Sequence, residues 1–459
     1  MLKVNEILKA TKGRLISGNR EISVKGISID SRTLKPGEAF IAIKGPNFDG
    51  HNFIAQALER KASCIIYHSP GYLVRGPAAK GAVFIKVKDT VRALGDIAGF
   101  NRRKFDIPVI VVTGSNGKTT TKDMIAAVLS KNFKVLKNAG TKNNHIGLPL
   151  TLLALSPAID TVVLEAGTNH PGEIAYLARI AGPNIAVITN IGPSHLQYFK
   201  NLQGVFKEKI SLIQHLKEPR IAVLNGDDSL LNKFLKQKAK LPLIFSFGVK
   251  NKTDFYAAKI DGLGARLQFL VNRRYKFTLN TPGLYNVYNA LAAITVARIL
   301  GMEYADIIER LCAFTLLQDR LSFVKLNNVQ FINDTYNSNP SSLKQALDVL
   351  EELKTGGRKI FVMGDMLELG NCDELFHRLA GERAASACDV FITVGPLTKF
   401  AADTAKRRGF DTRNIFTCET NREAKDVLFG KISLRPDDIV LVKGSRSMKM
   451  EEILDNPGN

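Results

Sequence analysis

The sequence has few cysteines, no low-complexity segment and no run of uncharged apolar residues long enough to span a membrane. Its five cysteines are scattered, odd in number and without C-x-x-C spacing, which argues against both a disulfide framework and a zinc site. The N-terminal stretch MLKVNEILKATKGRL is interrupted by charges and lacks the apolar centre of a signal peptide. We therefore expect a cytoplasmic protein with reduced thiols that is not an integral membrane protein.

Lysine and arginine outnumber aspartate and glutamate by 64 to 43, which gives a formal net charge of +21. Such an excess can indicate a nucleic-acid partner. The basic residues are nevertheless spread along the whole chain, with only short clusters such as NRRKF (101–105) and AKRRG (405–409). No zinc-finger, RNP or basic-region pattern accompanies them. We expect a solvated basic surface, suited to a polyanionic small-molecule substrate, and no nucleic-acid partner.

A chain of 459 residues is too long for one hydrophobic core, so several domains are expected. Short strands and turns come first, followed by a helix over 89–104. From 107 to 313 strands alternate with helices, apart from an antiparallel, hairpin-like insertion over 254–279. The pattern predicts an α/β protein of three domains: an N-terminal α/β domain (1–100), a central doubly wound parallel sheet (101–315) and a C-terminal Rossmann-like α/β domain (316–459).

The stretch VIVVTGSNGKTTTKDM (109–124) has the local pattern of a phosphate-binding loop. Residues 107–112 predict a buried parallel strand, and apolar residues recur at helical spacing from Lys118 onward. A strand, a glycine turn and a helix N-terminus direct backbone N–H groups and a positive dipole end at one point. Lys118 can supply a charge to the outer phosphates, and Thr119 can offer its hydroxyl to magnesium.

The spacing of this loop differs from the usual G-x-x-x-x-G-K-[ST] pattern. The first glycine of that pattern would fall at Val112, whereas here Gly114 precedes Gly117 by only three positions. The alternative interpretation is an ordinary strand-to-helix turn that is rich in small polar residues. The strand before the loop and the helix after it favour phosphate binding.

Polar residues stand where other predicted strands end, and the carboxyl ends of parallel strands share one sheet edge. Glu165 ends the strand in TVVLEAG and offers a carboxylate to the magnesium near Thr119. His195, in NIGPSHLQYF, follows the next strand, although a lone histidine is more often structural. In the third domain Asp334 and the turn at 442–448 stand at equivalent strand ends.

Seven motifs together resemble those of the Mur ligase family, and the likeness covers nearly the whole chain. The motifs are TGSNGKTT (113–120), LEAGTNHPGEIA (164–175), NIGPSHLQYF (190–199), NVYNALAA (286–293), INDTYNSNP (332–340), VMGDMLELG (362–370) and LVKGSRSM (441–448). Tyr285 stands where this family usually has histidine, and Asp319 where it usually has glycine. Neither difference removes a phosphate-binding or metal-binding group.

The resemblance implies an ADP-forming, ATP-dependent amide ligase with ATP and Mg²⁺ as cofactors. Its substrates would be a UDP-N-acetylmuramoyl tripeptide and D-alanyl-D-alanine, joined through an acyl phosphate to give the pentapeptide precursor of peptidoglycan, the cell-wall polymer needed for cell shape and division. We expect a monomer. Two alternatives stay open: a sister ligase, such as the one adding the third amino acid or a folylpolyglutamate synthase, and a nucleotide-regulated nucleic-acid-binding protein. Lysine and diaminopimelate are both possible at the third peptide position.

The resemblance also implies roles for individual residues. ATP would be bound by Thr113, Gly114, Ser115, Asn116, Gly117, Lys118, Thr119, Thr120, Asn289, Arg320 and Asp334. The metal ligands would be Thr119, Glu165, His195 and Lys209, with Lys118, Glu165, His195 and Lys209 forming the catalytic set. Ser31 and Arg32 would lie near the UDP moiety, Asn143 and Asn144 would face the substrate, and Tyr336, Asn337 and Asn339 would shape the dipeptide pocket.

Lys209 has a special role in this resemblance, because a lysine a little over a dozen residues beyond the metal-binding histidine is commonly carbamylated in the family. Counting from His195 selects Lys209 and not Lys207. Carbamylation would convert a cation, which would repel magnesium, into a carboxylate-like ligand. The alternative is a solvated helix lysine beside Glu208.

Overall fold

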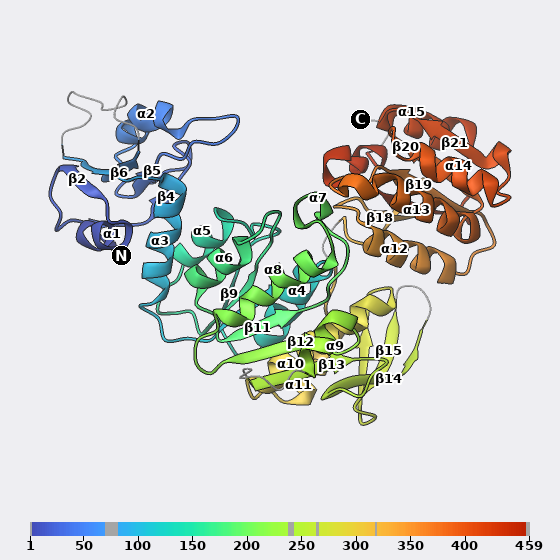
Figure 1. Cartoon of the computed structure of the whole chain (residues 1–459), viewed down its shortest axis with the longest axis horizontal. Coiled ribbons are helices and arrows are strands. Elements are labelled where there is room, and N and C mark those ends of the chain that lie inside the picture. The colour runs from blue at the N-terminus through green and yellow to red at the C-terminus, as the bar shows by residue number, and fades with distance from the viewer. Residues whose placement is uncertain (1, 69–80, 237–242, 263–265, 317–318, 456–459) are drawn as a thin grey trace.

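The computed structural model describes residues 2–68, 81–236, 243–262, 266–316 and 319–455. Figure 1 shows three α/β domains, with the N-terminal domain (blue) and the C-terminal domain (orange to red) on opposite sides of the central one. This confirms the predicted fold class. No helix in the described part of the chain is both long and apolar enough to cross a membrane.

The N-terminal domain is built on a five-stranded sheet in the order β2-β7-β6-β5-β4, in which only the β2–β7 pair is antiparallel. Helix α3 links this domain to the next, because its Leu94 and Ile97 belong to the N-terminal core while Ala98 belongs to a central one. The elements are β1 (Leu2–Lys3), α1 (Val4–Thr11), β2 (Arg14–Ser17), β3 (Ser23–Val24), β4 (Ile27–Ser28), β5 (Ala39–Ile41), η1 (Gly50–Phe53), α2 (Ile54–Glu59), β6 (Cys64–Tyr67), β7 (Val83–Lys86) and α3 (Thr90–Arg102).

The central domain has a nine-stranded sheet in the order β16-β15-β14-β13-β12-β11-β8-β10-β9. Its elements are β8 (Val109–Thr113), α4 (Lys118–Leu129), β9 (Val135–Lys137), α5 (Gly147–Leu153), β10 (Thr161–Glu165), α6 (Glu173–Ala181), β11 (Ile185–Ile188), α7 (Leu196–Phe199), α8 (Leu202–Gln214), β12 (Ile221–Asn225), α9 (Ser229–Leu235), β13 (Leu243–Gly248), β14 (Phe255–Asp261), β15 (Leu267–Val271), β16 (Tyr275–Leu279), α10 (Leu284–Ile299) and α11 (Tyr304–Cys312).

Strand β8 occupies the middle of the parallel part of this sheet, between β10 and β11. Successive side chains of a strand point to opposite faces, and both faces of β8 are covered. Ile110 and Val112 pack in a core with α4 and α10, whereas Val109 and Val111 pack in the core on the other side. The apolar run of β8 is therefore explained by double burial, although the strand begins two residues later than the sequence suggested and includes Thr113.

The antiparallel insertion predicted over 254–279 is confirmed, and it also extends the central sheet. Strand β14 pairs in parallel with β13, and β15 and β16 follow in antiparallel order. The insertion is thus part of the sheet and shares its core through Phe269 and Phe277.

The C-terminal domain has a six-stranded sheet, β17-β18-β22-β19-β20-β21, in which only β17–β18 is antiparallel. Asp334 and Lys443 are register partners where β18 and β22 end, which places two charged residues at one edge. The elements are β17 (Ser322–Leu326), β18 (Val329–Asp334), α12 (Pro340–Glu352), β19 (Lys359–Gly364), η4 (Gly370–Cys372), α13 (Asp373–Ala387), β20 (Val390–Val394), α14 (Lys399–Arg407), η5 (Thr412–Asn414), β21 (Ile415–Cys418), α15 (Asn421–Asp426), η6 (Val427–Lys431), β22 (Ile439–Lys443), η7 (Arg446–Met448) and η8 (Met450–Ile453).

Candidate active site

The loop after β8 requires glycine at two positions. Gly117 has φ of 78°, and a Cβ there would lie 2.4 Å from Asn289 Oδ1. Gly114 has φ of 153°, and a Cβ there would lie 1.9 Å from Thr189 Oγ1. Both conformations disfavour a side chain, and the surroundings leave no room for one. At these two positions the loop has no side chain, so an anion can approach the backbone directly before the N-terminus of α4, as phosphate binding requires.

The same loop is fixed to the segment that follows β11. Ser115 N donates to Asn190 O at 3.0 Å, and Asn116 N donates to Asn190 Oδ1 at 2.9 Å. Lys118 Nζ folds back onto the loop and donates to the carbonyls of Gly114 and Ser115 at 2.9 and 3.1 Å. Burial lowers the pKa of Lys118, and this effect is opposed by the nearby Glu165. The ammonium group is thus held at the loop, within reach of an anion bound there.

Glu165 is a buried carboxylate at the end of β10, beside the phosphate loop. Its Oε2 accepts a hydrogen bond from Thr119 Oγ1 and its Oε1 accepts one from Asn143 Nδ2, both at 2.6 Å. The loop that carries Asn143 is also held by Lys122, a fully buried lysine that donates to the carbonyl of Asn138 at 2.9 Å. Three residues predicted from sequence therefore meet here: Thr119, Asn143 and Glu165.

A cavity of about 260 Å³ lies between the central and C-terminal domains and contains most of the predicted ATP residues. It is lined on the central side by residues 115–120, Thr141, Asn143, Glu165, Gly167, Thr168, Asn169, His195, Tyr285, Asn286 and Asn289, and on the C-terminal side by Leu316, Arg320, Leu321, Asp334, Tyr336, Asn337, Asn339, Ser342, Gln345 and Lys443. The predicted residues Thr113 and Gly114 lie just before this wall, at the end of β8.

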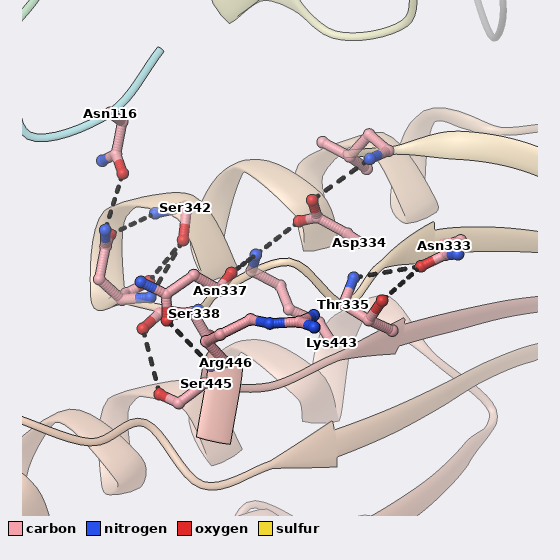
Figure 2. Close-up of polar contacts among 12 residues, drawn as sticks. Asn116, Asn333, Asp334, Thr335, Asn337, Ser338, Ser342, Lys443, Ser445 and Arg446 are labelled. Atoms are coloured by element: carbon pink, nitrogen blue, oxygen red, sulfur yellow. Dashed lines mark hydrogen bonds and ion pairs between the residues drawn. The ribbon is translucent and has the colours of Figure 1, made fainter. Parts of the chain in front are cut away.

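The C-terminal wall of the cavity contains a buried ion pair between Lys443 and Asp334, with 2.5 Å between Nζ and Oδ2. Figure 2 shows Lys443 between Asp334 and Asn337, whose carbonyl accepts from Lys443 at 2.8 Å. Burial raises the pKa of Asp334, and Lys443 opposes this rise. The guanidinium of Arg320 stacks over the ring of Tyr336, 3.9 Å from its centroid. This wall therefore presents the guanidinium of Arg320 beside a buried ion pair, with both groups held in fixed positions.

Side-chain hydrogen bonds connect the C-terminal domain directly to the central one. Asn339 Nδ2, at the start of α12, donates to Oδ1 of Asn116 in the phosphate loop at 2.7 Å. His195 Nδ1 and Glu368 Oε2 are 2.5 Å apart. The hydrogen bond with His195 lowers the pKa of Glu368.

Lys209 lies in α8 with only 2% of its surface exposed, so the alternative of a solvated helix lysine is wrong. Burial, reinforced by the positive charge of Lys118, lowers the pKa of Lys209 well below its usual value. The adjacent Glu208 is occupied elsewhere, since its carboxylate accepts from the backbone N–H groups of Gly172 and Ile174 at the start of α6. Among the described residues, none forms an ion pair with Lys209.

The remaining predicted residues lie outside the central cavity. Ser31 is buried in the N-terminal domain and donates to Gln56 Oε1 at 2.6 Å, whereas Arg32 is exposed and pairs with Asp30. Asn144 Oδ1 accepts from the backbone N–H groups of residues 146 and 147 at the start of α5. The structure thus gives Asn144 a helix-capping contact and leaves Ser31 and Arg32 in a different domain from the phosphate loop.

Two further cavities adjoin the central one. The first, of about 480 Å³, is lined by Asn169, Ser194, His195, Asn337, Ser338, Asn339, Leu367, Glu368, Leu369, Ser445, Arg446 and Ser447. The second, of about 570 Å³, shares Asn116, Gly117 and Asn289 with the central cavity and includes Phe247, Tyr285 and Tyr288. The phosphate loop is therefore accessible from more than one side.

The donor set fits a magnesium ion that is bound together with phosphate groups. Within the described residues, no three His, Cys, Asp or Glu side chains are close enough to form a metal site by themselves. Magnesium is usually held by one or two carboxylates together with substrate phosphates and water, and Glu165 and Thr119 offer such oxygens beside the phosphate loop.

Similarity to known proteins identifies the family of this chain. Three sequence profiles match in order: "Mur ligase family, catalytic domain" over 23–102, "Mur ligase middle domain" over 112–297 and "Mur ligase, glutamate ligase domain" over 319–446. The UDP-N-acetylmuramoyl-tripeptide–D-alanyl-D-alanine ligase of Bacillus subtilis is 36% identical, over 98% of this chain and 97% of its own. The chain belongs to the Mur ligase family.

Solved structures resemble this Mur ligase over nearly its whole length. A crystal structure of MurF from Acinetobacter baumannii has a TM-score of 0.88 and 32% identity, covering 98% of this chain and 97% of its own. MurF ligase from Thermotoga maritima in complex with ADP has a TM-score of 0.82 and 27% identity, covering 94% of this chain and 96% of its own. The similarity includes all three domains.

Sequence reasoning missed two residues of this Mur ligase site, Lys443 and Glu368. Both lie in motifs that carried the family resemblance: Lys443 is the last residue of β22 and begins KGSRSM, and Glu368 lies in VMGDMLELG, in the loop after β19. Lys443 could have been found from its position at a strand end opposite Asp334. Glu368 had no comparable signal, because its partner His195 lies 173 residues earlier in the chain.

Proposed function

We propose that this Mur ligase uses ATP to join D-alanyl-D-alanine to the terminal carboxylate of a UDP-N-acetylmuramoyl tripeptide, forming the pentapeptide precursor of peptidoglycan. The observation that carries the proposal is the cavity between the central and C-terminal domains. It combines the phosphate loop, the Glu165 carboxylate, the guanidinium of Arg320 and the Lys443–Asp334 ion pair. The names of the relatives favour this reaction over that of the ligase adding the third amino acid and over nucleic-acid binding.

ATP would bind with its phosphates at residues 113–120 and its base beside Asn289. The N-terminus of α4 and Lys118 would neutralise the outer phosphates. Arg320 and Asp334 would contact the nucleotide from the other domain. The side chain of Asn289, fixed by a 3.1 Å hydrogen bond from Thr121, adjoins the cavity that contains Phe247 and Tyr288, which suits a planar base.

The residues that would hold magnesium are Thr119, Glu165, His195 and carbamylated Lys209. When bound, the ion would neutralise charge on the ATP phosphates and on the activated carboxylate. Glu165 contributes a carboxylate whose two oxygens already face hydrogen-bond donors, Thr119 and Asn143. The orientation of Glu165 is thereby fixed before a ligand arrives.

The reaction that this site supports has two steps. A tripeptide carboxylate oxygen attacks the γ-phosphorus of ATP, and the bond to ADP breaks, giving an acyl phosphate. The amine of D-alanyl-D-alanine then attacks the acyl carbon, phosphate leaves, and the amine loses a proton as the amide forms. No enzyme nucleophile is needed, and no cysteine is among the described residues that line the cavity. Catalysis rests on positioning and on neutralised charge.

The substrates would approach from opposite sides. We assign residues 1–100 to the UDP-sugar, with Ser31 and Arg32 near the diphosphate, 101–315 to ATP, and 316–459 to closure over the nucleotide. The dipeptide would occupy the 480 Å³ cavity, whose lining includes the amides of Asn337 and Asn339 and the apolar side chains of Leu367 and Leu369. Tyr336 adjoins this region from the central cavity. Asn143 would lie near the tripeptide carboxylate, and Asn144 would support its loop.

The proposal is tested by following ADP release from purified protein with each substrate omitted in turn. Turnover should require ATP, Mg²⁺, a UDP-muramoyl tripeptide and D-alanyl-D-alanine together. Dependence on a free amino acid in place of the dipeptide would assign the chain to a sister ligase. Salt-sensitive DNA binding without any turnover would overturn the enzyme assignment. Lysine and diaminopimelate tripeptides should be compared in the same assay. We further propose that the protein is cytoplasmic, since ATP is supplied there, and that it acts as a monomer.

A further inference from the structure

The contact between His195 and Glu368 joins two loops from different domains. His195 precedes α7, the short helix that Figure 1 shows on the side of the central domain facing the C-terminal domain. Glu368 follows β19 of the C-terminal domain. A second contact supports the pair, because Gln197 N donates to Glu368 O at 3.4 Å. The two loops therefore meet through both side-chain and backbone atoms.

Both partners have a backbone conformation that is costly for their residue types. His195 has φ of 50° and Glu368 has φ of 64°, in the left-handed region that non-glycine residues rarely adopt. Such strain persists only where surrounding contacts determine it, and it gathers at functional positions. With both residues in this conformation, the imidazole Nδ1 and the carboxylate Oε2 are 2.5 Å apart.

The chemistry of the pair determines which imidazole nitrogen is free. A carboxylate can only accept a hydrogen bond, so the contact places the ring proton on Nδ1. In a neutral ring with this tautomer, Nε2 carries the lone pair. A metal-binding histidine commonly has this arrangement, in which a carboxylate holds the opposite ring nitrogen and fixes the orientation of the ring.

His195 is also shared by two cavities. It lines the central cavity with the phosphate loop and the 480 Å³ cavity with Glu368, Leu367 and Arg446. We propose that Glu368 is a positioning residue of the C-terminal domain, which orients His195 for magnesium only when that domain lies against the central domain beside the 480 Å³ cavity. The inference rests on the proposed function, since it assigns the metal to the ATP site and the dipeptide to the second cavity.

The first test is a nitrogen-15 NMR measurement of the His195 tautomer, which needs neither substrate nor metal. The signal is identified by its loss in His195→Gln. Wild-type protein should show His195 protonated at Nδ1, and Glu368→Ala should shift it toward the Nε2-protonated form that free imidazole prefers. Glu368→Gln keeps an oxygen acceptor and should retain the Nδ1 form. An unchanged tautomer in Glu368→Ala would show that the carboxylate does not determine which ring nitrogen carries the proton.

The second test is a Mg²⁺ titration of protein saturated with a non-hydrolysable ATP analogue, followed by calorimetry. Glu368→Ala should weaken Mg²⁺ binding about tenfold, the lower end of the effect of removing such a partner. The matched control is Glu382→Ala. Glu382 pairs with Arg408 on the same domain at 2.6 Å and is similarly exposed, 40% against 45% for Glu368. The control should change binding less than twofold.

In the ligase assay Glu368→Ala should raise both the Mg²⁺ requirement and the KM for D-alanyl-D-alanine, with the KM for the UDP-tripeptide unchanged. An unchanged His195 tautomer and an unchanged Mg²⁺ titration in Glu368→Ala would overturn the inference. If the alanine variant folds poorly, Glu368→Leu keeps the bulk without an acceptor and gives the same test. Failure of wild-type protein to release ADP would instead count against the proposed function, since the NMR and calorimetric results do not depend on turnover.

Discussion

Replacing Lys209 by alanine separates a carbamylated metal ligand from a buried structural lysine. The amine lies in α8 with 2% exposure, and burial lowers its pKa, because it penalises the charged form. The neutral form adds CO₂, forming an N–C bond and releasing one proton, which gives a carbamate. A carbamate would replace a cation next to Lys118 by an anion, and so relieve the repulsion in the native site.

The structural cost of Lys209→Ala is smaller than the stability of an ordinary domain. The change removes three buried methylene groups, at about 0.8 kcal/mol each, which lowers the free energy of unfolding by roughly 2.4 kcal/mol. Part of this loss is offset, because the variant no longer has an amine to bury. Domains are typically stable by about 5–15 kcal/mol, so the variant should fold. Loss of a metal-binding group should reduce activity about 10- to 100-fold, or about 1.4–2.8 kcal/mol in activation free energy.

The assay compares turnover of Lys209→Ala with that of Lys207→Ala, two residues away and exposed. Small carboxylates such as formate or acetate should restore part of the activity of Lys209→Ala and leave Lys207→Ala unaffected. Wild-type protein incubated with ¹³C-bicarbonate should give a carbamate carbon signal that is missing in Lys209→Ala. Near-wild-type turnover of Lys209→Ala without added acid, or no carbamate signal in the wild type, would refute the reasoning.

Three further predictions follow from the same structure. Lys118→Ala should lower turnover at saturating ATP by about 10²–10³-fold without unfolding the protein, as circular dichroism can verify, because the lysine acts by its charge. Glu165→Ala should raise the Mg²⁺ concentration for half-maximal activity at least tenfold, and an unchanged titration would rule out its metal role. Burial lowers the pKa of His377, which is fully enclosed and accepts from Met366 N at 3.0 Å. The unfolded state therefore binds more protons below about pH 6.5, so stability should fall as pH decreases from there toward the folded pKa, by up to about 1.4 kcal/mol per pH unit. Denaturant unfolding at several pH values should show that His377→Gln loses less stability than the wild type as the pH decreases.

The fold was largely predictable because its signals are local. Short runs of β-branched residues predict the buried strands, and glycines between a predicted strand and a predicted helix indicate the loop at 113–117. Thr119 and Glu165 could be paired because both stand at the carboxyl edge of one parallel sheet. The antiparallel insertion was also visible, but its attachment to β13 was not, since sheet order depends on contacts between distant segments.

The missed features are those that tertiary packing decides. The stretch KEK at 207–209 gives three consecutive charged residues, and only the packing of α8 shows that the last two are buried while Lys207 is exposed. The role of Glu368 depends on the placement of one domain against another. The prediction that Asn144 faces the substrate stays a prediction, and the structure adds a helix-capping contact of its Oδ1 that the sequence pattern did not indicate.

The acyl-phosphate reaction can be tested by tracing oxygen atoms. UDP-muramoyl tripeptide labelled with ¹⁸O in both oxygens of its terminal carboxylate is converted with unlabelled ATP, Mg²⁺ and D-alanyl-D-alanine, and the released phosphate is analysed by mass spectrometry. If the carboxylate attacks the γ-phosphorus, each phosphate should carry one ¹⁸O atom, and the new amide should keep the other. Phosphate without ¹⁸O, released together with pentapeptide, would contradict activation of the tripeptide by phosphorylation.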